Sequence, residues 1–135
     1  MKNLFLTAVA FVATLAVCGA ENPPALVPVP QHLTFESGRT VDLAAARICI
    51  PGQEKELIAA ATLFSRDLAR ESGLSLKVDR KSEGDIRLTL DPALGREAYR
   101  LTVGPEGVDI AGGSAAGVFY GLQSLRQLVA QYGAV

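Results

Sequence analysis

Apolar residues recur with the period of an α-helix from residue 53 to residue 72. They fall on one stripe of that helix, which consists of Leu57, Ala61, Phe64 and Leu68. Charged residues lie away from the stripe, so the predicted helix has one apolar face that must be buried against another element. Gly73 follows, and glycine readily takes the left-handed conformation that ends a helix. The pattern therefore predicts an amphipathic helix over residues 53–72.

A second helical pattern begins after Ser114, which can cap it, and runs to about Tyr132. Its apolar positions are Val118, Leu122, Leu125 and Val129. Gly117 and Gly121 interrupt good helix formers, and each costs about 1 kcal/mol relative to alanine in a helix. We therefore expect a packing reason for both glycines, namely close approach of this helix to a sheet or to the other helix.

Short segments rich in β-branched residues and bounded by turn formers predict the strands. They are residues 33–35 with a return at 39–43, then 48–50, 74–78, 86–90, 99–103 and 108–111. The turn at 104–107 has the length of a hairpin loop, so the last two strands are expected to pair antiparallel. Together the elements predict an α+β fold in which two helices pack on one face of a mostly antiparallel sheet and the other face stays open.

The first twenty residues have the features of an export signal. Lys2 precedes an uncharged stretch whose apolar part, Leu4 to Cys18, is shorter than the roughly 18–20 residues that span a membrane. Small residues at Cys18 and Ala20 fit cleavage after Ala20, so the mature chain would start at Glu21. The same stretch also resembles a lipoprotein box, although Val17 is bulkier than usual there. We expect a periplasmic or secreted protein, with an outer-membrane lipoprotein lipidated at Cys18 as the alternative.

The rest of the 135-residue chain is long enough for one domain. Residues 21–30 contain four of the seven prolines and predict an extended, irregular lead-in, which leaves residues 31–135 as the folded domain. An α/β barrel needs about 250 residues and does not fit. The content of 49% hydrophobic and 20% charged residues predicts a packed core. With 13 basic and 14 acidic residues and no basic cluster, nucleic acid is not an expected partner.

Few residues could carry chemistry. His32 is the only histidine and lies beside Pro30 in the irregular lead-in, where a solvated or hydrogen-bonded loop residue is the favoured interpretation over a metal ligand or triad member. Glu83 and Asp85 flank a glycine, which is typical of a polar turn rather than of an acid/base pair. Cys49, between two isoleucines, is interpreted as a small buried hydrophobe and not as a reactive thiol.

The glycine-rich segment 112–117 follows a predicted strand and opens a helix, as in a phosphate-binding loop. Ser114 stands where a dinucleotide fingerprint has glycine, and the chain ends before a second βα unit. A tight strand-to-helix turn is therefore favoured over nucleotide binding. We expect no catalytic residue, no cofactor and no metal site in this chain.

The order of several motifs resembles a known family. They are Val29-Pro30-Gln31, the helix end Glu71-Ser72-Gly73, the strand segment 97–103 (EAYRLTV), Gly107-Val108-Asp109-Ile110, and the helix segment 116–128 (AGVFYGLQSLRQL). Found in this order, they resemble the N-terminal domain of bacterial family 20 glycoside hydrolases, the β-N-acetylhexosaminidases. The strand and helix motifs are the specific ones, and the resemblance covers nearly all of the chain beyond the leader.

The resemblance implies a non-catalytic domain that packs against a following (β/α)₈ barrel, its partner. In the family the barrel hydrolyses terminal β-linked N-acetylglucosamine or N-acetylgalactosamine from glycans, and the acetamido oxygen of the substrate is the nucleophile. An adjacent Asp-Glu pair of the barrel assists it, and no Asp-Glu step occurs in this sequence. We expect a fragment that lacks the barrel and is inactive alone. The alternatives are a free-standing carbohydrate-binding or interaction domain and the N-terminal domain of a related glycosidase with another specificity.

Overall fold

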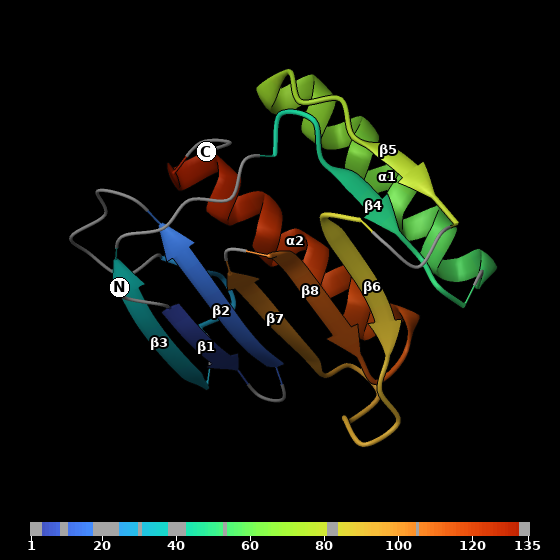
Figure 1. The fold of residues 1–135 in the computed structure, drawn as a ribbon. Coiled ribbons are helices and arrows are strands. Elements are labelled where there is room, and N and C mark those ends of the chain that lie inside the picture. Colours follow the sequence, from blue (N-terminus) through green and yellow to red (C-terminus); the bar gives the residue numbers. More distant parts are fainter. Residues whose placement is uncertain are drawn as a thin grey trace.

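The computed structural model describes residues 4–8, 11–17, 25–29, 31–37, 43–52, 54–80, 84–104 and 106–132. Eight strands and two helices occur in these segments (Figure 1). In chain order they are β1 (Leu4–Ala8), β2 (Phe11–Val17), β3 (His32–Ser37), β4 (Arg47–Cys49), α1 (Lys55–Ser72), β5 (Lys77–Asp79), β6 (Ile86–Leu90), β7 (Tyr99–Gly104), β8 (Gly107–Gly112) and α2 (Ala115–Tyr132). The strands form one sheet in the order β1-β3-β2-β7-β8-β6-β4-β5, with a further pairing between β1 and β2.

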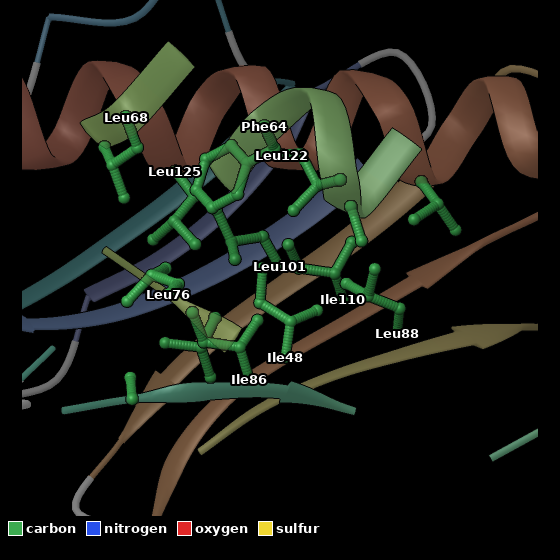
Figure 2. Close-up of a cluster of buried hydrophobic side chains, with 14 of the residues drawn as sticks. Ile48, Phe64, Leu68, Leu76, Ile86, Leu88, Leu101, Ile110, Leu122 and Leu125 are labelled. Carbon is green, nitrogen blue, oxygen red and sulfur yellow. The ribbon is translucent and has the colours of Figure 1, made fainter. Parts of the chain in front are cut away.

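Both helices lie on the same face of the sheet, and the core fills the space between the two layers (Figures 1 and 2). The four apolar residues of the α1 stripe are all buried, and Gly73 ends the helix at φ 75°, as expected. Figure 2 shows Phe64 of α1 and Leu122 of α2 among the strand side chains Leu101 and Ile110. These side chains are at most 1% exposed. The α+β class and the helix positions are thus confirmed.

The sheet is mixed, which corrects the expectation of a mostly antiparallel one. The β7–β8 hairpin is antiparallel, as its short loop predicts, but β6 pairs with β8 in parallel. β4 is parallel to both β5 and β6. For β4 and β5 the physical reason is that α1 returns the chain to the end of the sheet where β4 began, so β5 runs in the same direction. β5 also starts three residues later than expected, at Lys77. The returning strand expected at residues 39–43 falls mainly on residues outside the described part.

The face of the sheet opposite the helices is polar. On it, Arg87 of β6 lies beside Asp109 of β8 in the strand register. Its Nε and Nη2 atoms donate to the two carboxylate oxygens of Asp109 at 2.5 and 2.7 Å. A bidentate pair of this kind fixes the relative position of two neighbouring strands. Among the residues whose side chains the structure describes, the large apolar cluster lies on the helix side of the sheet (Figure 2).

The segment expected to be an export signal forms strands in the uncleaved chain. β1 and β2 pair with each other in antiparallel fashion, and β3 pairs with both. β2 also meets the edge of β7 through the pair Phe11↔Tyr99. The removal of this leader remains a prediction, because the structure is that of the whole chain. The lead-in, residues 25–29, forms neither helix nor strand, as expected.

The two glycines of α2 have the packing role that the sequence predicts. A Cβ atom on Gly117 would lie 2.2 Å from the Ala98 carbonyl oxygen, and one on Gly121 would lie 2.5 Å from Cγ2 of Ile110. Atoms at such distances overlap, so only glycine lets α2 approach β7 and β8 this closely. At Gly117 the obstacle is backbone, which cannot rotate away.

Replacing Gly117 by alanine tests this packing. A helix interior ordinarily gains about 1 kcal/mol from Gly→Ala. Here the clash should reverse the sign and lower the free energy of unfolding by about 1–3 kcal/mol, as overpacked cores do. Urea denaturation followed by circular dichroism measures the change. Gly104→Ala is the matched control, since nothing lies within 4 Å of its Cβ position. Equal stability of the two variants would contradict the packing role.

Candidate functional site

The glycine-rich segment before α2 is a closed turn. The Gly113 amide donates to the Ala98 carbonyl at 2.9 Å, and the Ala116 amide donates to the Ser114 hydroxyl at 3.2 Å. A Cβ atom on Gly113 would lie 1.9 Å from the Gly95 carbonyl oxygen. The backbone of the preceding loop therefore occupies the space that a phosphate would need. This geometry favours the turn with a serine cap and accounts for glycine at position 113 by close packing.

Cys49 is fully buried, as its apolar neighbours predict. Burial, followed by the nearby negative charges of Asp79 and Asp85, raises the pKa of its thiol. A raised pKa keeps the thiol protonated at neutral pH, and the protonated form is a poor nucleophile. A Cβ atom on Gly84 would lie 1.9 Å from the Cys49 sulfur, so the turn before β6 covers the thiol. Cys49 is therefore a packing residue.

The remaining candidates do not form a reaction centre in the described segments. His32 begins β3 instead of lying in a loop, so that part of the expectation was wrong, and the role of its side chain remains a prediction. Asp85 accepts a hydrogen bond from the Arg47 amide at 3.0 Å, as a turn residue does, whereas Glu83 lies outside the described residues. Among the described residues, no group of three or more His, Cys, Asp or Glu side chains could hold a metal ion.

The structure instead reveals a pocket that sequence reasoning missed. It has a volume of about 470 Å³ and lies between the lead-in and the outer side of α2, beside the first residue of β7. We call it the lead-in pocket. Its lining consists of Val27, Pro28, Val29, Glu97, Tyr99, Phe119, Tyr120, Gln123, Ser124 and Gln127. The walls are mainly apolar or aromatic, with polar groups at a few points, which is the composition of a binding surface.

Two glutamines of α2 hold the lead-in that forms one wall of this pocket. The side-chain amide of Gln127 accepts from the Val27 amide and donates to the Val27 carbonyl, both at 2.9 Å. Gln131, one helical turn later, accepts from the Ala25 amide at 2.9 Å and donates to the Ala25 carbonyl at 2.6 Å. Leu26, between the two bonded residues, is buried in the core at 4% exposure. The two glutamines thus bond the backbone of the lead-in through paired donors and acceptors, as a neighbouring strand does in a sheet.

The floor of the pocket is polar but not reactive. The hydroxyl groups of Tyr99 and Ser124 are hydrogen-bonded to each other and buried. Burial raises the pKa of the Tyr99 phenol well above its usual range, and the bond to Ser124 opposes this shift only in part. The phenol therefore stays neutral, and the pair stabilises the contact between β7 and α2. In the described part of the chain, the hydrogen bond of the Ser124 hydroxyl is to the Tyr99 phenol and not to a base.

The rim of the pocket exposes apolar surface. The described residues include five exposed large apolar side chains, and three of them line this pocket. They are Val27 at 78%, Val29 at 80% and Tyr120 at 44% exposure. Exposed apolar side chains gathered around a pocket are typical of a surface that another protein segment covers. The sequence signal that could have located it is the spacing of Gln123, Gln127 and Gln131 at every fourth residue of one helix face.

Comparison with known proteins gives a family for most of the chain. Residues 23–135 match the family described as glycosyl hydrolase family 20, domain 2. The chain is 37% identical over 115 residues to a β-N-acetylhexosaminidase of Cellulomonas fimi, a match that covers 81% of this chain and 23% of that protein. It is 33% identical over 81 residues to a lacto-N-biosidase of Bifidobacterium bifidum, covering 56% of this chain and 7% of the relative.

A solved structure agrees with these sequence matches. The N-acetyl-β-hexosaminidase of Streptomyces plicatus, in complex with Thio-NAglucal, superimposes with a TM-score of 0.57 at 36% identity. The superposition covers 63% of this chain and 17% of that protein. The chain thus spans less than a quarter of the length of each of these relatives. Neither α1 nor α2 is long and apolar enough to cross a membrane.

Gln127→Ala tests whether the glutamines hold the lead-in. The variant loses two hydrogen bonds, each contributing about 1 kcal/mol, so the Val27 amide should exchange with solvent at least about fivefold faster. Hydrogen exchange read by mass spectrometry on the peptide that covers residues 25–31 measures this. Gln123→Ala is the control, since no hydrogen bond joins Gln123 to the lead-in among the described residues. Unchanged exchange in Gln127→Ala would contradict the assignment.

Proposed function

Because this chain belongs to glycosyl hydrolase family 20, whose domain 2 is matched by residues 23–135, we propose that it is the non-catalytic N-terminal domain of an exported β-N-acetylhexosaminidase. The parent enzyme would hydrolyse terminal β-linked N-acetylglucosamine or N-acetylgalactosamine from glycans. The observation that carries this proposal is the match of nearly the whole folded chain to less than a quarter of a β-N-acetylhexosaminidase. Such a relation is expected of an accessory domain that accompanies a larger catalytic one.

The proposal places the chemistry outside this chain. The family's barrel uses an adjacent Asp-Glu pair, and the sequence has no Asp-Glu step. Export is proposed from the leader, with its positive Lys2, its short apolar stretch and its small residues before Glu21. A periplasmic or secreted location follows from cleavage after Ala20, and attachment to the outer membrane would follow from lipidation of Cys18 instead.

We propose that the catalytic barrel covers the lead-in pocket. The two open faces of the domain differ in chemistry, which favours this side. The outer face of the sheet carries charged side chains such as Arg87 and Asp109, whereas the helix side exposes Tyr120 and the two valines of the lead-in. Loss of water from apolar surface drives stable domain contacts.

A substitution in the pocket rim tests this docking surface. In the protein translated through the coding sequence that follows Val135, Tyr120→Asp should weaken the contact by about 1–2 kcal/mol, as loss of an interface aromatic does. Limited proteolysis between the two domains and thermal unfolding of the barrel measure the change. Leu90→Asp is the matched control, because Leu90 is similarly exposed, at 41%, but lies at the end of β6, outside the lead-in pocket. Equal effects of the two substitutions would contradict docking at the pocket.

A second specificity is supported by one relative. The lacto-N-biosidase that matches 81 residues of this chain belongs to another substrate class, so the same domain could accompany a glycosidase that releases a different sugar unit.

A free-standing carbohydrate-binding module is the other alternative. Such a module needs exposed aromatic platforms, and the chain has no tryptophan. Phe119 and Tyr120 at the pocket are its best candidates.

An activity assay separates these functions. The purified 135-residue chain should release no 4-nitrophenol from 4-nitrophenyl N-acetyl-β-D-glucosaminide, because its sequence has no adjacent Asp-Glu pair of the kind that the family's barrel uses. Turnover would overturn the proposal. Saturable binding of chitooligosaccharides, measured by calorimetry, would favour the module. An in-frame barrel with an adjacent Asp-Glu pair downstream of Val135 is the expected genetic result, and its substrate profile would distinguish a hexosaminidase from a lacto-N-biosidase.

A further inference from the structure

The leader strand β2 lies at one edge of β7, and the cleavage that we expect would remove this strand. β7 pairs with β8 at six positions on one side, whereas on the other side it meets β2 at Phe11↔Tyr99. The family match begins at residue 23, so both leader strands lie outside the family domain. We propose that after removal of residues 1–20, β3 takes the place of β2 and pairs in parallel with β7. The proposal rests on the cleavage that the proposed function includes.

Removal of the leader would open two edges at once. Every strand pairing that the structure gives to β3 is with β1 or β2, so cleavage leaves all six residues of β3 without a strand partner. The same cleavage exposes the edge of β7 (Figure 1). Unpaired backbone groups at a sheet edge are sites of aggregation. Pairing β3 with β7 satisfies both edges in one step.

The direction of β3 suits this exchange. β2 is parallel to β3 and also parallel to β7. β3 therefore already runs in the direction of β7, and only the leader strands β1 and β2 lie between or beside the two. Since cleavage removes both leader strands, a sideways shift of one or two strand positions, about 5–10 Å, brings β3 to the edge of β7 with no change of direction.

The strand register of the uncleaved sheet predicts which residues of β3 would lie beside which residues of β7 after cleavage. Val12 pairs with His32, and the preceding residue of β2, Phe11, pairs with Tyr99. Carried along the strands, these two pairings place Leu33 beside Leu101. They likewise bring Phe35 to the level of Val103.

Leu101 and Val103 are buried on the helix side, at 0% and 3% exposure. The alternation of a strand therefore directs positions 33 and 35 to the core and positions 32, 34 and 36 to the polar face. The residues at these positions, Leu33 and Phe35 on one side and His32, Thr34 and Glu36 on the other, fit that division. The leader strand Phe11–Val17 has no such alternation, since its only polar residue is Thr14. β3 is thus a better match than β2 for a sheet with one apolar and one polar face.

The lead-in supplies the tether that the exchange requires. Gln127 and Gln131 hold residues 25 and 27 on α2, and Val29 lines the same pocket as Tyr99 of β7. His32 follows Val29 by three residues, and an extended chain of that length spans up to about 10 Å. The start of β3 can therefore reach the edge of β7 while the lead-in stays in place.

A cross-linking experiment tests the exchange in the full chain. A site for a sequence-specific protease replaces residues around Ala20, the leader's Cys18 is changed to serine, and Thr34→Cys is combined with Thr102→Cys. The two positions are expected at the same level of neighbouring strands after cleavage. Before cleavage at least one leader strand separates them, by about 9.6 Å or more, beyond the roughly 7 Å that a disulfide spans between Cα atoms.

Mild oxidation should give the 34–102 disulfide only after the protease has acted. Peptide mapping under non-reducing conditions identifies it. The matched control combines Thr34→Cys with Thr89→Cys of β6, which should form no disulfide in either state. Hydrogen exchange on α1 and β8 shows whether the cleaved chain is folded.

Absence of the 34–102 disulfide in a folded, cleaved chain would overturn the proposal, as would unfolding on cleavage. A disulfide between two molecules, which indicates that a second copy occupies the edge of β7, would overturn it too. Because an added protease makes the cut, the result does not depend on export, on the barrel or on any glycan. Failure of the proposed function and failure of this inference are therefore separate outcomes.

Discussion

The close approach of α2 to the sheet is the contact on which the rest of the domain depends. Gly117 and Gly121 remove two Cβ atoms that would overlap the Ala98 carbonyl and the Ile110 side chain. The helix then lies low enough for Leu122 and Val118 to be fully buried, and α1 packs beside it. Arg126 of α2 lies 3.7 Å from Asp67 and 3.6 Å from Glu71 of α1, which adds charged contacts at the surface of the helix pair. The core is therefore set by backbone proximity more than by any polar interaction.

The lead-in pocket is also shaped by this placement of α2. Its inner face is buried on β7 and β8, so its outer face and the lead-in form the surface that remains. Gln127 and Gln131 convert this helix face into a support for an extended backbone, because each side-chain amide offers one donor and one acceptor. Because α2 packs on one face of the sheet, the apolar rim of the lead-in pocket lies on the helix side and the polar side chains lie on the opposite face. The apolar rim is suited to contact with a protein partner, whereas the polar face is suited to contact with water.

Predictions from sequence were accurate where a local pattern carries the information. The stripe ending at Leu68, the stop at Gly73 and the cap at Ser114 depend on residues a few positions apart. The short loop before Gly107 likewise determines an antiparallel hairpin. The candidate site could not be predicted in this way. Ala25 and Gln131 are 106 positions apart, and no periodicity relates a proline-rich segment to the far end of the chain.

The sequence by itself determined the α+β class, the helix positions, the buried state of Cys49 and the packing role of two helix glycines. The physical reason is that hydrophobic periodicity and glycine geometry are properties of neighbouring residues. Only the tertiary structure decided which strands are neighbours, that most of these pairings are parallel, and that the lead-in lies against α2 to form a pocket. Those outcomes depend on which backbone edges and apolar faces meet once the chain has closed on itself, and that information is spread over residues distant in sequence.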